Sequence, residues 1–213
     1  MYPIDERNKV RRLPERGAYD RDSIYPVLDE GLLAHVGFAA NGQPTVIPMT
    51  YARDGDDLIL HGSVASRLLK IGSEGVPMSV CVTFLDGLVL ARSTFNHSMN
   101  YRSVVAFGNA RVVDEPAEKM AALDLLVEHL IPGRTGNARA SNRKELGATT
   151  VLRMPIEQAS LKQRSGPPGD NPADMSLGHW AGVIPMTTQF GTAIADEPCM
   201  DMPIPDHVSQ YQR

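Results

Sequence analysis

The sequence predicts a mainly β fold with added helices (α+β), in which antiparallel strands close into a small barrel. Three observations support this prediction. About six segments combine apolar, β-branched and aromatic residues in runs of strand length. Turn signals join these segments into a meander, an order that closes naturally into an antiparallel barrel. Helical patterns occur in few places and do not alternate regularly with the strands, which argues against a doubly wound parallel sheet.

The first half of the chain is expected to hold one short helix followed by three strands. Residues 1–20 read as extended, and residues 23–33 carry apolar side chains at helical spacing after Ser23, the predicted N-cap. The strands that follow are predicted at 33–40, 44–53 and 57–61. Asn41-Gly42 is the strongest short hairpin signal in the sequence, and the run DGDD that begins at Asp54 is turn chemistry.

The second half is expected to hold two helices and the remaining strands. A helix is predicted at about 65–73 and a longer one at 115–130, which has Pro116 at its start and an apolar stripe. Strands are predicted at 78–84, at 87–93 (a separate strand or a continuation), at 103–113 and at 149–156. Gly108 interrupts one of them, which in a strand often marks a bulge or a barrel corner. Residues 198–213 read as an extended tail.

Length and charge bound the class of protein. The 213 residues fit one large domain with appendages, divided here into an N-terminal arm (1–22), a barrel domain (23–195) and a C-terminal tail (196–213). With 42% hydrophobic residues the chain can bury a core, and its net charge of −4 gives no reason to expect nucleic-acid or membrane partners. The basic residues at 7–16 are interpreted as a solvated arm.

The sequence also predicts a cytoplasmic protein without a metal site. No apolar run is long enough to span a bilayer, and the N-terminus lacks the apolar core of a signal peptide. The two cysteines, Cys81 and Cys199, have no metal-binding spacing. Cys81 lies in a strand-like run and is interpreted as a small buried hydrophobe.

Side chains suited to holding a phosphate follow the strand predicted at 57–61. They are His61, Gly62, Ser63, Ser66, Arg67 and Lys70. A glycine lets backbone N–H groups approach an anion, serine hydroxyls donate to phosphate oxygens, and an arginine forms a two-pronged bond. The alternative is that Ser63 or Ser66 only caps the next helix and that Arg67 and Lys70 are solvated.

Two further segments are rich in polar and aromatic side chains. Residues 86–105 carry Arg102 and Ser103 at the start of a strand, and His97, which is a proton carrier, an iron ligand or an ordinary loop histidine. Lys162 and Arg164 point the same way if their segment is a strand. Trp180, the only tryptophan, is interpreted as a packing residue, with stacking on a planar ligand as the alternative. His61 likewise reads as a satisfied strand-end histidine if it is not a ligand.

These motifs resemble a known family in their order and spacing. The runs are VIPMTY (46–51), LILHGSVASR (58–67), MSVCVTF (78–84) and YRSVVAFGNARVV (101–113), followed by a helix that contains Glu118-Lys119. This order is similar to the pyridoxamine 5′-phosphate oxidase-like FMN-binding split barrel. The segments DGLVLARS…HSMNYRSVV and LKQRSGPP…WAGVIP resemble its flavin-nucleotide-binding branch, which is related to nitroimidazole-resistance proteins. The similarity covers residues 10–195.

The resemblance implies a six-stranded antiparallel split barrel that forms a homodimer with FMN at the subunit interface. It implies that the isoalloxazine ring is lined by Pro48, Met49, Thr50 and Tyr51. It implies that the ribityl chain and phosphate are held by His61, Ser63, Ser66 and Arg67. Arg102 and Ser103 would meet the polar edge of the ring, and Lys162, Arg164 and Trp180 would reach across from the partner subunit. Leu68 and Tyr51 stand where the oxidase has basic residues, so the resemblance does not extend to pyridoxamine phosphate oxidation.

The function expected from the resemblance is that of an FMN-dependent oxidoreductase. The substrate would be a small aromatic, nitro or quinone-like molecule, and NAD(P)H would supply electrons. No residue is assigned to proton transfer, because no acid–base pair stands out. One alternative is a flavin or haem carrier or sensor without turnover, with His61 or His97 as axial ligand of the haem. Another is a deazaflavin in place of FMN.

Overall fold

The structure, a computed structural model, describes residues 1–212 and has the antiparallel, β-dominated α+β fold that the sequence predicts. It contains two compact units. The first unit comprises Met1–Gly31, Val80–Phe107 and Glu157–Thr188, and the second comprises Leu32–Ser79, Gly108–Ile156 and Gln189–Arg213. The six-stranded barrel, and the division into arm, barrel domain and tail, stay predictions.

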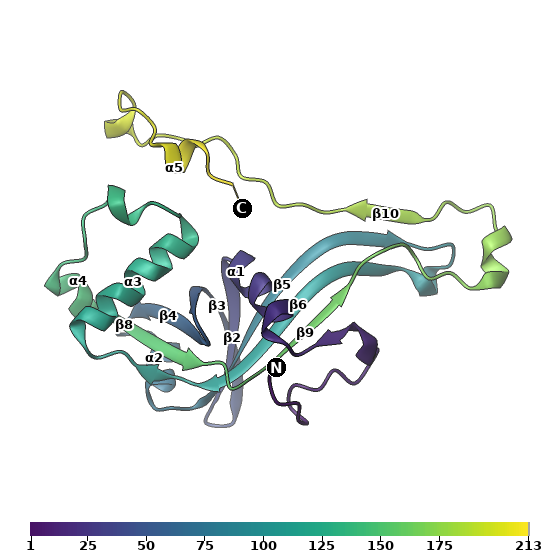
Figure 1. Ribbon diagram of the computed structural model, residues 1–213, viewed down its shortest axis with the longest axis horizontal. Coiled ribbons are helices and arrows are strands. Elements are labelled where there is room, and N and C mark those ends of the chain that lie inside the picture. Colours follow the sequence, from purple (N-terminus) through teal and green to yellow (C-terminus); the bar gives the residue numbers. More distant parts are fainter. Residues whose placement is uncertain (213) are drawn as a thin grey trace. The chain divides into compact units, whose positions relative to one another are not determined.

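In the first unit the hydrogen-bonded strand order is β1 (Gly17–Ala18), β9 (Gln158–Arg164), β6 (Ser98–Asn109), β5 (Pro77–Leu90), with β10 (Gly182–Pro185) paired antiparallel to β5. Figure 1 shows β5 and β6 as long curved strands with β9 alongside. Helix α1 (Arg21–Glu30) belongs to this unit. The Asp20 side chain caps it by accepting from Ser23 N at 2.8 Å, so the predicted Ser23 cap is wrong by one turn of the helix.

The N-terminal arm is attached to the first unit, so its interpretation as a wholly solvated segment is wrong. Asn8 is 3% exposed, and its Nδ2 donates to Pro3 O at 2.8 Å and to Ala159 O at 3.2 Å. Arg7 Nε donates to Gln158 Oε1 at 2.7 Å. Val10 N donates to the Tyr19 hydroxyl at 2.7 Å. These bonds hold residues 7–10 in place, two of them directly on β9.

In the second unit the strand order is β2 (Leu33–Ala40), β3 (Gln43–Asp54), β4 (Asp57–Ser63), β8 (Thr149–Pro155), β7 (Arg111–Val112), with antiparallel pairing at every step. Asn41 and Gly42 form the β2–β3 turn with φ of 52° and 74°. The hairpin predicted from this pair is therefore confirmed, because its turn needs two left-handed residues and Asn-Gly supplies them.

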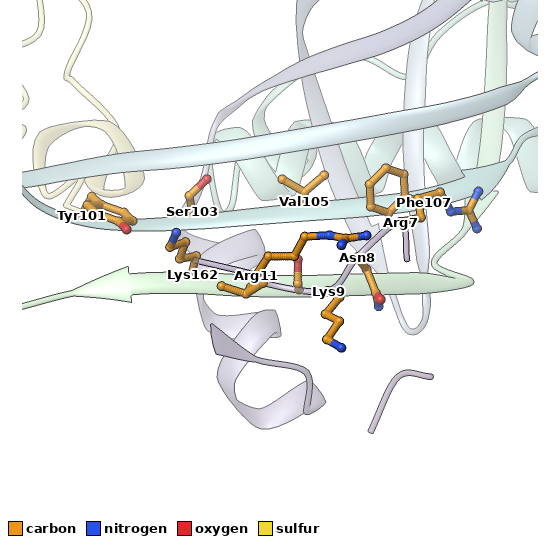
Figure 2. Close-up of a pocket in the computed structure, with 11 residues that line it drawn as sticks. Arg7, Asn8, Lys9, Arg11, Tyr101, Ser103, Val105, Phe107 and Lys162 are labelled. Carbon is orange, nitrogen blue, oxygen red and sulfur yellow. The ribbon is translucent and has the colours of Figure 1, made fainter. Parts of the chain in front are cut away.

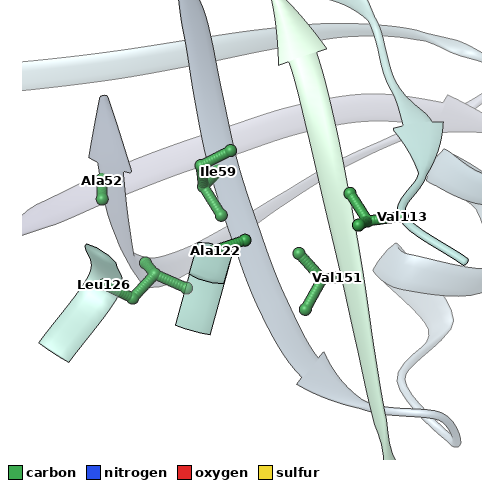
Figure 3. Packing of buried hydrophobic residues seen from close by; sticks show 6 residues of the cluster. All are labelled: Ala52, Ile59, Val113, Ala122, Leu126 and Val151. Carbon is green, nitrogen blue, oxygen red and sulfur yellow. The ribbon is translucent and has the colours of Figure 1, made fainter. Parts of the chain in front are cut away.

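Helices α2 (Arg67–Ser73), α3 (Pro116–Leu130) and α4 (Arg143–Ala148) lie against strands of the second unit. Helix α5 (Asp206–Ser209) also belongs to this unit. Helix α3 buries Ala122 and Leu126 against Ala52, Ile59 and Val151, as Figure 3 shows. The helix predicted at 115–130 is thus confirmed, with Glu115 as its cap. Short 3-10 helices lie at Pro14–Arg16, Thr94–Asn96, Thr135–Asn137, Pro172–Ser176 and Glu197–Cys199.

The remaining differences from the predicted elements concern four segments. The segments predicted at 78–84 and 87–93 form the single strand β5, which confirms the alternative that the second continues the first, and β6 begins earlier than predicted, at Ser98. Helix α4 and strand β10 were not predicted, and the tail contains α5 in addition to extended chain. Over residues 1–212, no helix is long and apolar enough to cross a membrane.

Candidate functional site

The segment between β4 and α2, residues 62–67, holds the side chains predicted to bind phosphate. Ser63 is the last residue of β4, and its Oγ accepts from Ala65 N at 3.2 Å. The Ser63 carbonyl accepts from Ser66 N at 2.9 Å. These two bonds close the turn and bring together the exposed Ser63 and Arg67 and the half-buried Ser66. We call residues 62–67 the β4–α2 turn.

Ser66 and Arg67 keep most of their donors available. Ser66 stands at the N-cap position of α2, as the capping interpretation predicts, but its side chain makes no capping hydrogen bond. Arg67 is exposed and donates through Nη2 to Thr45 Oγ1 of β3 at 3.2 Å. Among the described residues it has no ion pair with a carboxylate. A hydroxyl and a guanidinium of this kind are suited to an incoming anion.

The strand β3 presents only part of its predicted ring-lining segment outward. Pro48 pairs with His35 and Thr50 with Leu33, so Pro48 and Thr50 share the outer face of β2 and β3. Tyr51 points the other way and is fully buried, with its ring centroid 5.5 Å from that of His129. A ligand on the outer face would therefore meet Pro48 and Thr50, and Tyr51 packs in the core.

His61 is half-buried on β4 beside the turn. Burial lowers the pKa of its imidazole, which favours the neutral form. Its Nδ1 is buried and has no hydrogen-bond partner among the described residues, so the interpretation as a satisfied strand-end histidine is wrong. An unpartnered buried ring nitrogen next to the β4–α2 turn is unusual for a purely structural histidine.

In the first unit, Arg102 is bound by two carboxylates. It donates to both oxygens of Glu30 (Nη2 to Oε1 at 2.9 Å) and of Asp86 (3.1 and 3.0 Å), and lies 4.6 Å from the ring centroid of Phe84. Hydrogen bonds to Glu30 and Asp86 hold the pKa of the guanidinium above its usual range. This arrangement gives Arg102 a structural role that the sequence did not indicate.

Ser103 lies on the opposite face of β6 from Arg102, because neighbouring strand residues alternate. Its hydroxyl is 2.9 Å from that of Thr83 and 3.8 Å from Cys81 Sγ. Cys81 is half-buried on the same face, so its interpretation as a buried hydrophobe is wrong. The edge of an isoalloxazine ring placed on one face of β6 would therefore meet Arg102 or Ser103, but not both.

The three residues predicted to reach across from a partner have different surroundings. Lys162 pairs in register with Ser103 and lines a pocket. Arg164 donates to the Asn100 side chain and to the carbonyls of Gly166 (3.2 Å) and Pro167 (2.7 Å), so it anchors the loop after β9. Trp180 is 69% exposed with its ring against Gly182, so its interpretation as a packing residue is wrong.

A family model described as pyridoxamine 5′-phosphate oxidase matches residues 20–163 of the chain. The chain belongs to the pyridoxamine 5′-phosphate oxidase-like family. The resemblance to this family that the sequence motifs indicated is therefore confirmed. No curated protein matches the chain.

Solved structures of related proteins extend the match over nearly the whole chain. A flavocytochrome from Azotobacter vinelandii is 37% identical with a TM-score of 0.92, over 98% of this chain and 97% of that one. A FAD and haem binding protein from Mycobacterium smegmatis is 40% identical with a TM-score of 0.87, over 91% and 95%. A candidate 5-nitroimidazole antibiotic resistance protein from Bacteroides thetaiotaomicron shares the fold, at 23% identity and a TM-score of 0.54, over 68% and 86%.

Sequence reasoning within this family missed a group of cations far apart in the chain. Lys9 and Arg11 of the N-terminal arm line the same pocket as Lys162 of β9. The cluster of basic residues at 7–16 was a signal, but its separation from residue 162 in the sequence hides that these residues line one pocket. Among the described residues, no three His, Cys, Asp or Glu side chains are grouped to hold a metal ion.

Proposed function

We propose that this member of the pyridoxamine 5′-phosphate oxidase-like family is a flavin-dependent oxidoreductase that holds the flavin phosphate at the β4–α2 turn. The observation that carries this proposal is the combination of Ser63, Ser66 and Arg67 in one exposed turn with their donors largely unused. A dianionic phosphate matches two hydroxyls and a two-pronged guanidinium. Pro48 and Thr50 on the outer face of β3 would lie under the ring.

A bound flavin would supply hydride and electron chemistry, and the chain would supply orientation and a water-poor surface. We propose a small aromatic, nitro or quinone-like substrate and a nicotinamide dinucleotide as electron source. The family resemblance favours FMN, whereas the related Mycobacterium smegmatis protein is described as binding FAD. Heat release of the chromophore from purified protein, followed by chromatography against FMN, FAD and deazaflavin standards, identifies the cofactor. A folded protein that neither contains nor takes up a flavin would contradict the proposal.

Arg67→Ala is expected to weaken flavin binding by about 10- to 100-fold, because a hydrogen bond to a charged group contributes about 1.5–3 kcal/mol. The side chain is exposed, so the variant should fold normally. Flavin titration followed by fluorescence measures the effect. Arg143→Ala, which removes an exposed arginine at the start of α4, is the matched control and should bind flavin like the unmodified protein. Equal flavin affinity in the two variants would show that the flavin phosphate is not held at this turn.

We also propose that the protein acts as a homodimer. Leu33 and Val46, on the same outer face of β2 and β3, are 50% and 64% exposed. Exposed apolar residues grouped on one sheet face favour a protein–protein contact. Light scattering after size-exclusion chromatography should give a mass near twice 23.2 kDa. Val46→Lys should shift the mass towards one chain, and a monomeric mass for the unmodified protein would contradict the proposal.

Haem binding is a second candidate function, favoured by the two related structures that are described as a flavocytochrome and as a FAD and haem binding protein. His97 fits an axial ligand. Its Nδ1 lies 2.9 Å from the Ser93 carbonyl, which leaves Nε2 with a free lone pair. A metal-bound histidine usually donates its second ring N–H to such a carbonyl. The buried, unpartnered Nδ1 of His61 makes that residue the other candidate.

If haem is bound, the purified protein should show a Soret band, and His97→Ala should shift or abolish it. His179→Ala, at an exposed histidine in the loop before β10, is the control and should leave the band unchanged. A band lost in His61→Ala and retained in His97→Ala would reassign the ligand to His61. A protein that shows no Soret band even after incubation with haemin would exclude this candidate.

A further inference from the structure

A pocket of about 470 Å³ lies on one face of the first unit. Its floor is the outer face of β6 and β9, where Ser103 pairs with Lys162 and Val105 pairs with Ser160. Residues 7–11 of the N-terminal arm complete the lining. Figure 2 shows Tyr101, Ser103, Val105 and Phe107 following one another along β6, with Lys9 and Arg11 of the arm nearby. We call it the basic pocket.

The arm that borders the basic pocket is held by residues other than Lys9 and Arg11. Asn8 is bonded to Pro3 and Ala159, and Arg7 is bonded to Gln158 and lies 5.0 Å from the ring centroid of Phe107. Lys9 and Arg11 are therefore not needed to attach the arm. They remain on its exposed side as part of the pocket lining.

The protein neutralises only part of the positive charge in the basic pocket. Four cationic residues line it (Arg7, Lys9, Arg11 and Lys162), and the lining contains no Asp or Glu. Among residues 1–212, no ion pair is formed by Lys9 or by the half-buried Lys162. Arg11 pairs with Glu6, but the two side chains are 66% and 81% exposed, so the pair contributes little. In a chain with a net charge of −4 this is a strong local concentration.

The rest of the lining indicates what kind of anion fits. The hydroxyls of Ser103 and Ser160 add donors for oxygen atoms beside Lys162. Tyr101 and Val105 add apolar surface on either side of Ser103 along β6, and aromatic side chains favour contact with a flat ring. The volume is within the range of about 300–1,000 Å³ typical of small-molecule sites.

We propose that the basic pocket binds a purine nucleoside that carries a phosphate group, the chemistry of the adenosine end of a dinucleotide. Lys162, Lys9 and Arg11 would hold the phosphate, and the Tyr101 ring would contact the base. Two sources carry this chemistry, the 2′-phosphoadenosine of NADPH and the adenosine phosphate of FAD. The proposal does not depend on where the flavin phosphate is held.

Calorimetric titration of the purified protein with adenosine 2′,5′-bisphosphate tests the proposal. Binding at micromolar to submillimolar concentration is expected, weakening as salt is added. Lys162→Gln should raise the Kd by at least about tenfold, since one charge-assisted contact is lost. Arg11→Gln, on the exposed arm where folding is not at risk, should raise it severalfold. Lys144→Gln, at an exposed lysine of α4, is the control. No binding at millimolar concentration, or an unchanged Kd in Lys162→Gln, would overturn the proposal.

Competition then distinguishes the sources and the part played by the base. Displacement of the bisphosphate by NADPH at lower concentration than by FAD assigns the nicotinamide dinucleotide, and the reverse order assigns the flavin dinucleotide. If inorganic phosphate displaces the bisphosphate as effectively as NADPH or FAD does, the purine base plays no part in binding. Arg67→Ala should bind adenosine 2′,5′-bisphosphate as tightly as the unmodified protein does. The flavin assignment at the β4–α2 turn and the ligand assignment of the basic pocket can therefore fail independently of each other.

Discussion

Replacing Gly108 with alanine is expected to lower the free energy of unfolding by about 3 kcal/mol, at the upper end of the usual cost of overpacking. Gly108 is buried near the end of β6. A Cβ atom there would lie 2.0 Å from the Pro155 carbonyl oxygen and 3.2 Å from Met154 Cγ. The first of these neighbours is backbone, which cannot move aside as a flexible side chain can. The strand would have to shift away from the end of β8.

Thermal unfolding followed by circular dichroism measures this effect, and a 3 kcal/mol loss in a chain of this size lowers the midpoint by roughly 6–12 °C. Gly147→Ala is the matched control. Gly147 lies in α4 and a Cβ there would meet nothing within 4 Å, so alanine should be neutral or slightly stabilising. An unchanged midpoint for Gly108→Ala would show that the two backbones do not approach this closely.

Gly108 also illustrates how far the sequence predicts the fold. The glycine signalled a corner or bulge in the strand, and the structure shows the reason, a close approach by a second backbone. Gly87 was predicted to begin a separate strand or to continue the one before it, and it lies within β5. The Ile184 carbonyl of β10 would lie 3.0 Å from a Cβ at this position, so glycine permits this close pairing. That neighbour is distant in the chain, so local patterns cannot reveal it.

Elements fixed by adjacent residues were the ones that the sequence predicted well. The Asn41-Gly42 hairpin needs only its own turn residues. Helix α4 was missed although it carries a local signal, a capping box in which Asn142 Oδ1 accepts from Glu145 N at 3.0 Å and Glu145 accepts from Asn142 N at 2.9 Å. The helix spans six residues and has no apolar stripe, and that length is too short for periodicity to detect.

The candidate site residues also fall into two groups, those that the sequence could bring together and those that it could not. Ser63, Ser66 and Arg67 are neighbours in the sequence, and the structure brings them together in one turn. The basic pocket joins the N-terminal arm to Lys162, which no spacing rule indicates. Arg102 was read as a cofactor contact because it is an arginine at a strand start. Its partners Glu30 and Asp86 come from other elements and became visible only in the folded chain.

Arg102→Met is expected to destabilise the protein by about 2 kcal/mol, because it leaves Glu30 and Asp86 without their shared cation. Removing one partner of a fully buried pair costs about 3–5 kcal/mol. The three side chains are 30–42% exposed, so water screens part of the repulsion and the expected loss is smaller. Methionine retains much of the contact with Phe84, which isolates the electrostatic part of the effect.

A double-mutant cycle separates the network from simple loss of packing. Asp86→Asn combined with Arg102→Met should be more stable than the sum of the single changes predicts, because the double variant has one carboxylate fewer to leave unpaired. Urea denaturation of the four proteins gives the coupling free energy, and an additive result would mean that the Asp86 contact contributes nothing.

Flavin affinity in Arg102→Met decides whether the guanidinium also serves the cofactor. Both of its bonding edges are occupied by carboxylates, so little positive charge is left for a flavin ring. We therefore expect the folded variant to bind flavin within about threefold of the unmodified protein, a difference of less than 1 kcal/mol. Arg67→Ala should show the opposite pattern, with normal stability and weak flavin binding. If Arg102→Met has the stability of the unmodified protein but does not bind flavin, Arg102 is a cofactor-binding residue.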